Sequence, residues 1–421
     1  MKAAVRALFV LALIATGCGG DGAAGGEVVE IFGPYQGRQA DLFTADLQAW
    51  AATEGIAIRY TGTGNFADDL ERQVYGLSDP PDIAVVPQRG VVERLAADGR
   101  IRAMPVEVVA AAGERLAPGA VQLAEVDGEL VGVPVQVNVK SLVWYRPSIF
   151  AALGLGVPDT LDELEALVAA AAAEGISPWC LAIEAQTATG WPATDWIEDL
   201  VVRRSGPATY EQWVRGDVAF ADDRIAAAFD EFATLVADRR VAGGITAALS
   251  TSTQDGDDPL FTDPPGCVLY KQASFARGWM PDGLQFGPDG DLDAFVLPGV
   301  DADELPPLVV GADLAVAFDQ GDAVDAVLEF LTTADAGRSW AAAGGYVNPR
   351  TDVDPDTYFQ PSDRFAAERL LSHPTLVYDA SDAMAPEIGA GLFWEEITRW
   401  LSGAVPVDEL AATLDAARGG G

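Results

Sequence analysis

Alternation of strand-like and helix-like segments is the strongest pattern in the first quarter of the chain. Short runs rich in apolar and β-branched residues are separated by segments whose apolar positions recur with the period of a helix. The pattern predicts, in order, a strand at 28–32, a helix from about residue 40, a strand at 56–60, a helix at 68–75 and a strand at 82–86. Such an order indicates a parallel sheet with helices packed on its faces, and therefore an α/β fold.

The same two kinds of segment return later in the chain. The clearest helix starts behind Thr160, which has capping-box spacing to Glu163, and it ends at Gly175. Further elements are expected as helices behind residue 222 and over 322–331, and as strands at 295–297 and 314–318. The Gly-, Asp- and Pro-rich segment 251–265 predicts a long surface loop. With 421 residues, 49% of them hydrophobic, the chain can bury more than one core, and we expect two domains.

The chain is strongly acidic, with a formal net charge of −38. Nucleic-acid backbones are bound by clustered Lys and Arg, so this charge excludes a nucleic-acid-binding protein. The acidic residues are spread along the sequence, which indicates a well-solvated surface. We expect a monomer.

The N-terminus has the features of an export signal. Lys2 and Arg6 precede a short apolar run, and small residues stand directly before Cys18, so we expect a signal peptide at 1–17. This stretch resembles a bacterial lipoprotein box, which implies that Cys18 carries the lipid and that 18–27 form the anchor and a flexible linker. The mature protein would then meet the membrane only through its lipid, outside the cytoplasm. An ordinary signal peptide with cleavage nearby is the alternative.

Two further cysteines, Cys180 and Cys267, form an even pair in a chain expected to reach an oxidising compartment. We predict a disulfide between them. A free, buried pair of thiols remains the alternative.

Most enzyme chemistry is missing from the sequence. His373 is the single histidine, and it precedes Pro374 in a polar stretch, so we expect no His/Cys zinc site, no His-dependent triad and no His-rich metal site. Residues 62–67 imitate a dinucleotide fingerprint, but they follow the second strand rather than the first, so we interpret them as a tight turn that can meet a ligand. Paired carboxylates such as Glu395 and Glu396 leave a secreted glycoside hydrolase as the alternative function. We expect no catalytic residue, no metal and no cofactor.

The aromatic residues point to a carbohydrate ligand. The chain contains 10 Trp, several of which stand beside polar residues, as in Trp191-Pro192 and Asp195-Trp196. Sugar rings stack on aromatic faces, and their hydroxyl groups need polar partners close by. Core packing is the competing explanation for each single Trp.

Several segments carry a family resemblance. They are P-P-D-I-A-V-V-P-Q (80–88), K-S-L-V-W-Y (140–145), A-T-G-W-P-A-T-D-W-I-E-D (188–199), P-P-G-C-V-L-Y-K-Q-A-S-F (264–275) and G-G-Y-V-N-P-R (344–350). The chain resembles extracellular solute-binding protein family 1, and within it the α-glucoside-binding proteins of bacterial ABC importers. The resemblance implies a protein without enzymatic activity, which passes a small sugar to the membrane permease subunits.

The resemblance also implies the periplasmic-binding-protein fold, with two α/β lobes, three hinge crossings and a ligand cleft between the lobes. We place the crossings near 137–140, 309–313 and 346–349. Lobe 1 would then contain 28–137 and 314–345, and lobe 2 would contain 138–313 and 346–421.

The ligand-binding residues are carried over position by position. Thirteen residues are implied, with Trp191 and Trp196 stacking on sugar and polar side chains bonding to hydroxyl groups. The set is Tyr35, Asn65, Gln88, Asn138, Lys140, Trp191, Asp195, Trp196, Gln272, Ser274, Phe275, Asp313 and Arg350.

Overall fold

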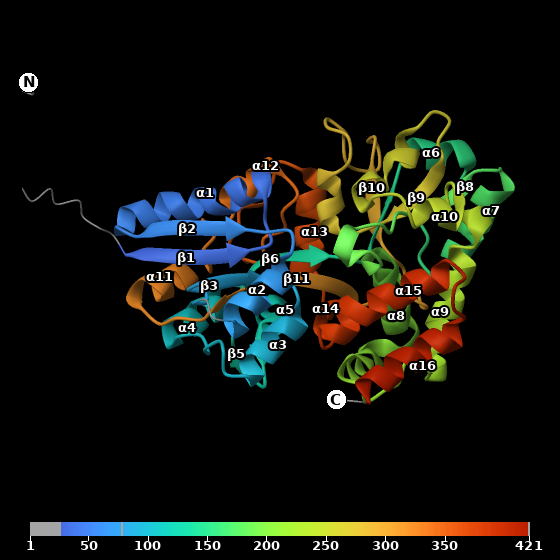
Figure 1. The fold of residues 1–421 in the computed structure, drawn as a ribbon. Helices are drawn as coiled ribbons and strands as arrows, with labels where there is room; N and C mark the ends of the chain where they lie inside the picture. The colour runs from blue at the N-terminus through green and yellow to red at the C-terminus, as the bar shows by residue number, and fades with distance from the viewer. Residues whose placement is uncertain (1–26, 77–78, 420–421) are drawn as a thin grey trace, which may run out of the picture.

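The computed structural model describes residues 27–76 and 79–419. The expected signal peptide, Cys18 and nearly all of the expected linker lie outside these residues. The described chain forms two lobes that lie side by side, each built around its own sheet (Figure 1). This arrangement confirms the predicted α/β class.

The first sheet has six strands, ordered β12-β11-β3-β1-β2, with β6 paired to β11 as well. Its strands are β1 (Val28–Gly33), β2 (Ala57–Gly62), β3 (Ile83–Val86), β6 (Val133–Val139), β11 (Leu308–Ala317) and β12 (Leu376–Tyr378). Parallel pairing of β1 with β2 and β3 confirms the sheet predicted from the first quarter of the chain.

Strand β11 differs most from its prediction. It begins at Leu308 rather than at residue 314, and it runs through the expected crossing at 309–313. All ten of its residues are buried, because its early part pairs with β12 and β6 and its late part with β3. A fully buried strand has no polar alternation to mark its start, which explains the difference.

The second sheet is ordered β10-β7-β9-β8. Its strands are β7 (Leu142–Tyr145), β8 (Ser177–Cys180), β9 (Cys267–Lys271) and β10 (Asp293–Val296). A disulfide joins Cys180 to Cys267, so the predicted bridge is confirmed. A small separate hairpin contains β4 (Glu125–Val126) and β5 (Glu129–Leu130).

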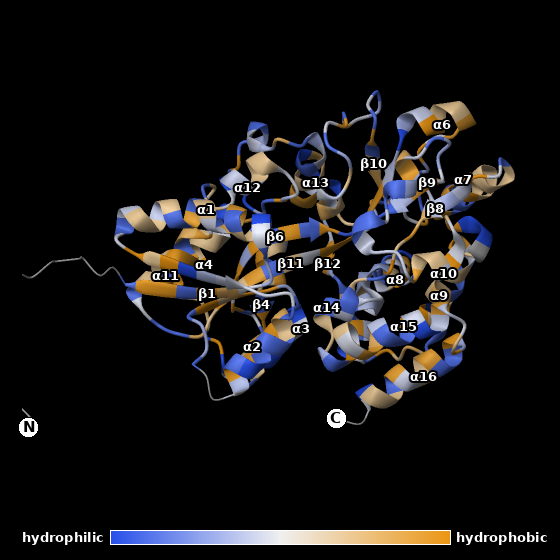
Figure 2. Ribbon diagram, turned by 45° about the horizontal axis from the view of Figure 1, so that its top comes forward, coloured by the Kyte–Doolittle hydropathy of each residue, from blue (hydrophilic) through white to orange (hydrophobic). Residues whose placement is uncertain are grey.

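Seven helices surround the first sheet. They are α1 (Gly37–Glu54), α2 (Phe66–Tyr75), α3 (Arg89–Ala97), α4 (Val106–Arg115), α5 (Pro118–Leu123), α11 (Asp322–Phe330) and α12 (Arg338–Ala343). Helix α1 buries Phe43 and Leu47, and Trp50 stacks on Phe330 of α11 at 4.5 Å between ring centroids. Hydrophobic residues dominate the strands, whereas the helices carry both hydrophobic and hydrophilic residues (Figure 2).

The other helices surround the second sheet or lie between the sheets. They are α6 (Pro147–Leu153), α7 (Leu161–Ala173), α8 (Trp191–Arg215), α9 (Asp223–Leu235), α10 (Gly244–Ala248), α13 (Pro361–Ser372), α14 (Ala380–Ala383), α15 (Trp394–Leu401) and α16 (Val407–Arg418). Helix α7 has the predicted cap, since Thr160 Oγ1 accepts from the Glu163 amide at 3.2 Å. Among the described residues, no helix is long and apolar enough to cross a membrane.

Short helical turns complete the chain. They are Gln186–Ala188, Asp238–Arg240, Thr253–Asp255, Asp258–Phe261, Ser274–Gly278 and Pro355–Thr357, together with a π-helix at Glu387–Phe393. Two of these turns lie in the predicted surface loop 251–265. Leu260 in that segment is fully buried, so the segment packs on the lobe instead of forming a simple surface loop.

Candidate functional site

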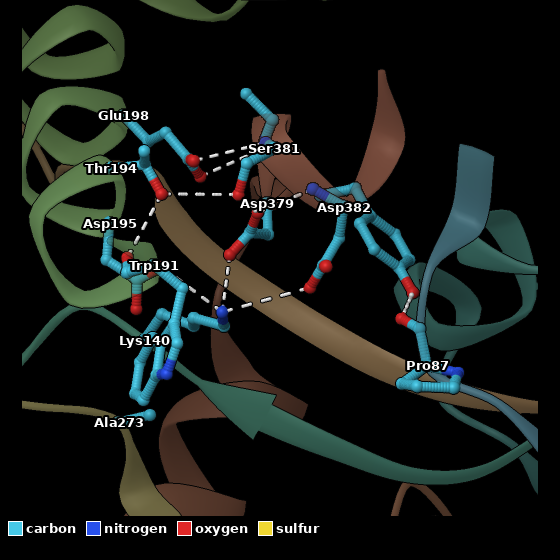
Figure 3. Close-up of polar contacts among 12 residues, drawn as sticks. Pro87, Lys140, Trp191, Thr194, Asp195, Glu198, Ala273, Asp379, Ser381 and Asp382 are labelled. Carbon is cyan, nitrogen blue, oxygen red and sulfur yellow. Dashed lines mark hydrogen bonds and ion pairs between the residues drawn. The ribbon is translucent and has the colours of Figure 1, made fainter. Parts of the chain in front are cut away.

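Lys140, directly after β6, is the centre of a buried polar cluster between the lobes. Its ammonium lies 3.2 Å from a carboxylate oxygen of Asp195 and 3.9 Å from one of Asp382, and it forms an ion pair with Asp379. Figure 3 shows the lysine reaching between α8, which carries Asp195, and the segment that carries the other two acids. A charged group buried this deeply needs opposite charges and hydrogen bonds, and Lys140 has both.

The start of α8 positions two of the predicted residues together. Trp191 and Asp195 are four residues apart, so they lie on one face of the helix. Gly190, before the helix, has φ 118°, and a Cβ there would lie 2.3 Å from the Trp394 carbonyl oxygen. Only glycine fits both the left-handed backbone and this close approach, which fixes where α8 begins.

The segment after β12 supplies two acids that the sequence analysis missed. Asp379 caps α14, accepting from the Asp382 amide at 2.9 Å and from the Ser381 hydroxyl at 2.8 Å. Glu198 of α8 accepts from the amides of Ala380 at 2.8 Å and Ser381 at 3.1 Å. These bonds tie α8 to α14 and hold the carboxylates around Lys140.

Aromatic rings form one side of the cluster. Trp191, Phe275 and Trp279 are all half-buried, with ring centroids 5.9 Å apart for the first pair and 5.2 Å apart for the second. The ammonium of Lys140 lies 5.2 Å from the centroid of the Trp191 ring. A partly open aromatic surface next to a charged polar cluster can stack a flat apolar ring face and bond its polar edge.

Burial and mutual contact shift the pKa values in the cluster. Burial alone would lower the pKa of Lys140, but the charges of Asp195 and Asp379 raise it well above its usual range. Burial raises the pKa of Asp195 to about 7, despite the opposing effect of Lys140. Burial would also raise the pKa of Asp379, but the charge and hydrogen bond of Lys140 hold it at about 2. Lys140 and Asp379 are therefore the fixed ion pair of the cluster.

The carboxylate oxygens of Asp195, Glu198 and Asp379 lie within 4.8 Å of one another, a spacing that suits a cation. The Lys140 ammonium already contacts two of these acids, and Glu198 accepts from two backbone amides. The lysine thus supplies the positive charge that the carboxylates need.

A second polar group lies on the first sheet. The Tyr35 hydroxyl donates to Asp313 at 2.5 Å, and Gln136 Nε2, another residue missed by the sequence analysis, donates to the same carboxylate oxygen at 2.7 Å. Burial raises the pKa of Asp313, while bonds from Tyr35 and Gln136 and the charge of Lys140 lower it. Asp313 thus holds Tyr35 and Gln136 together on the first sheet.

Three other predicted residues lie at the first lobe or its edge. Asn65 is exposed directly before α2, and Gln88 is half-buried directly before α3, where its buried Oε1 has no hydrogen-bond partner. Asn138 on β6 is opposite Gly311 of β11 in the sheet register. The side chain of Gln88 therefore has one acceptor that is not used by any contact within the described residues.

Four predicted residues are occupied by internal contacts. Trp196 is 2% exposed, with Trp179 and Phe232 against its ring at centroid distances of 4.7 and 5.7 Å. Arg350 is 1% exposed, and its guanidinium donates to carbonyls of Val135 and Leu331.

The buried polar groups of Gln272 and Ser274 are also used internally. Gln272 Oε1 accepts from the Ala273 amide at 2.8 Å, and Ser274 Oγ accepts from the Val139 amide at 3.2 Å. In this structure internal contacts hold the side chains of all four residues, which are Gln272, Ser274, Trp196 and Arg350.

Comparisons with known proteins agree with this architecture. Residues 36–338 match the family model described as bacterial extracellular solute-binding protein. The alpha-glucosides-binding periplasmic protein AglE of Rhizobium meliloti (strain 1021) is 35% identical over 401 residues, covering 93% of this chain and 87% of that protein. The osmoprotective compounds-binding protein GgtB of Synechocystis sp. is 33% identical over 413 residues, covering 95% of each.

Solved structures show the same fold at low identity. A chitin oligosaccharide binding protein superposes with a TM-score of 0.77 at 16% identity, covering 93% of this chain and 97% of that one. The bacterial solute receptor AcbH gives a TM-score of 0.74 at 19% identity, covering 93% and 96%. These relatives and structural neighbours are binding proteins, not enzymes. The chain belongs to the bacterial extracellular solute-binding protein family.

Proposed function

We propose that this solute-binding protein captures a small carbohydrate, an α-glucoside such as a disaccharide, and delivers it to the permease of an ABC importer. The observation that carries the proposal is the half-buried aromatic surface of Trp191, Phe275 and Trp279 beside the Lys140 cluster. The name of AglE, a relative at 35% identity, supports an α-glucoside as the ligand.

In this proposal different residues contact different parts of the ligand. Trp191 and Phe275 stack on a sugar ring. Lys140 donates a hydrogen bond to one sugar hydroxyl group, and Asp195 accepts a hydrogen bond from another. Gln88 and Asn65 approach from the first lobe with the Tyr35–Asp313 pair behind them. Trp196 and Arg350 act as structural residues, because neither reaches solvent in this structure.

Binding proceeds by hinge closure between the lobes in the same proposal. Two separate sheets support it, since each lobe is built around a sheet of its own. In this proposal the three crossings lie near 137–140, 309–313 and 346–349, as the family resemblance implies. Strand β11 supports a bend there, because its pairing with β6 shifts register between Asp313 and Leu314.

We also propose export through the signal at 1–17 and anchoring of the mature protein to the membrane through Cys18. The small residues before Cys18 and the glycines after it support this step.

Calorimetric titration of the purified protein tests the ligand. The panel contains maltose, sucrose, trehalose and raffinose, with glycine betaine added because one relative is named for osmoprotective compounds and because acids beside aromatic rings also suit a cation. Saturable binding of an α-glucoside is expected. Binding of glycine betaine alone would show that the carbohydrate proposal is wrong, and release of glucose from the disaccharides would show a hydrolase.

A further inference from the structure

A second buried ionic cluster lies directly behind the ligand site. Lys271, the last residue of β9, has its ammonium 2.8 Å from a carboxylate oxygen of Asp199, and Asp199 also pairs with Arg203. The side chains of Asp199 and Arg203 are fully buried, and that of Lys271 is 1% exposed. No ligand can reach this cluster, so its role has to be exerted through other residues.

The spacing along α8 connects this cluster to the site. Trp191, Asp195, Asp199 and Arg203 follow each other at intervals of four, so they form one stripe along the helix. The stripe begins at the half-buried Trp191 and ends inside the lobe at Arg203.

Lys271 holds the backbone of the two residues whose side chains pair in the site. Its ammonium donates to the carbonyl oxygen of Lys140 at 3.4 Å and to that of Asp195 at 3.2 Å. The ammonium of Lys271 thus contacts one carboxylate and two backbone carbonyls. One side chain thereby fixes the relative position of β6, α8 and β9.

Hydrogen bonds also connect this ionic cluster to β11, the strand at the proposed middle crossing. Asp199 accepts from the Ser141 hydroxyl at 2.6 Å, and Ser141 Oγ accepts in turn from the Val309 amide at 2.9 Å. The Lys140 amide also donates to the Val309 carbonyl oxygen at 2.8 Å. The residues that hold the site are therefore bonded to the start of β11.

Stability alone is a weak reason to bury three charges. Desolvation of a buried ion cluster offsets most of its attraction, and apolar residues of similar volume often stabilise a core as well. An ammonium held by one carboxylate and bonded to two backbone carbonyls fixes instead the geometry of the backbone, which a preorganised binding site requires.

We infer that Lys271, held by Asp199, is the positioning residue of the ligand site: it aligns Lys140 with Asp195 so that a sugar meets this pair already in place. The inference rests on the proposed sugar site. The ammonium of Lys271 lies 5.3 Å from the centroid of the Trp196 ring. Trp196, which the family resemblance implied as a sugar-stacking residue, therefore packs on Lys271 in this structure.

Lys271→Met tests the inference, because it keeps an unbranched side chain only one atom shorter and removes the ammonium group. Asp199 still keeps Arg203 and Ser141 as partners. Sugar affinity of the folded variant is expected to fall about tenfold or more. Asp199→Asn, which keeps the shape of the side chain, is the second variant and is expected to weaken binding less.

A thermodynamic cycle separates positioning from a general loss of stability. If Lys271 acts through Asp195, the affinity loss caused by Lys271→Met should largely disappear in the Asp195→Ala background. Additive losses would overturn the inference, and so would affinities within twofold of wild type for both single variants.

A measurement without ligand keeps this inference separate from the proposed function. The indole nitrogen-15 signal of Trp191 should shift in Lys271→Met, because Lys140 stands over that ring, whereas the signal of Trp213 in the distant Phe220–Phe393 core should not. An unchanged Trp191 signal would overturn the inference. Absence of sugar binding by the wild type would instead contradict the proposed function.

Discussion

The ammonium of Lys140 lies 5.2 Å from the centroid of the Trp191 ring and 3.2 Å from the carboxylate of Asp195, one helical turn further along α8. The stacking surface and the polar cluster therefore share one lysine. A ligand that stacks on Trp191 is brought within reach of the acids without any rearrangement of α8.

Trp191→Ala should weaken sugar binding by about 5- to 150-fold, or about 1 to 3 kcal/mol, since it removes the stacking surface. The matched control is Trp213→Phe in the buried core, which should lower the melting temperature and leave affinity unchanged. Both quantities are measured on both variants. If Trp191→Ala bound sugar as tightly as the wild type, Trp191 would not belong to the site.

Asp195→Ala should cost at least as much affinity as Trp191→Ala, because a sugar hydroxyl loses its acceptor and Lys140 loses one of its partners. Asp195→Asn keeps an acceptor oxygen and should lose less. The double variant Trp191→Ala/Asp195→Ala should lose less than the two single losses together, because both residues touch one ligand. Strict additivity in calorimetry would place them at separate sites.

Reduction of the Cys180–Cys267 bridge should lower the melting temperature. The cysteines are 87 residues apart, and the loop-entropy description gives about 4 kcal/mol or somewhat more for a loop of this length. The reduced protein should be heavier by about 2 Da, the mass of two hydrogens. Full labelling of both thiols in the folded, unreduced protein would contradict the bridge.

Stability should fall as pH rises from about 5 to about 8. Burial raises the pKa of Asp363 to about 7, from about 4 in the unfolded chain. The folded state therefore binds this proton more tightly, and the stabilisation present at low pH is lost as pH rises through the folded pKa. Asp363→Asn should reduce the slope of melting temperature against pH, whereas the exposed Asp352→Asn should not. Equal slopes for wild type and Asp363→Asn would refute this assignment.

Cys18→Ala should move the protein from the membrane fraction to the soluble fraction and leave sugar affinity unchanged, because every predicted ligand-binding residue stands at position 35 or later in the sequence. Fractionation followed by calorimetry on the released protein checks both expectations. Membrane association that survives the substitution would show that Cys18 is not the anchor.

Sequence pattern predicted best where local chemistry alone decides the structure. The capping box at Thr160 and Glu163 and the first three strands need no information from distant residues. The family-like segments also placed Lys140, Asp195 and Trp191 in one site, and the structure brings these three together.

The missed and misplaced residues have physical explanations. Asp379 is 239 residues from Lys140, and periodicity carries no information about a contact at that distance. Trp196 was predicted beside Trp191 from a short run of sequence. At about 100° per residue, five helical positions rotate a side chain about 140° away, so Trp196 points to the core while Asp195 stays beside Trp191. A prediction that treated 191–196 as a helix would have placed the two indoles on different faces.

Strand β11 has a consequence for the order in which the protein folds. It begins at residue 308 of 421, yet it pairs with β3 and β6 from the first third of the chain. The first lobe cannot complete its sheet until most of the polypeptide has been synthesised, and these non-local pairings slow collapse. A sheet that stays incomplete for so long leaves strand edges unpaired, so the growing chain needs protection from aggregation until β11 has been made.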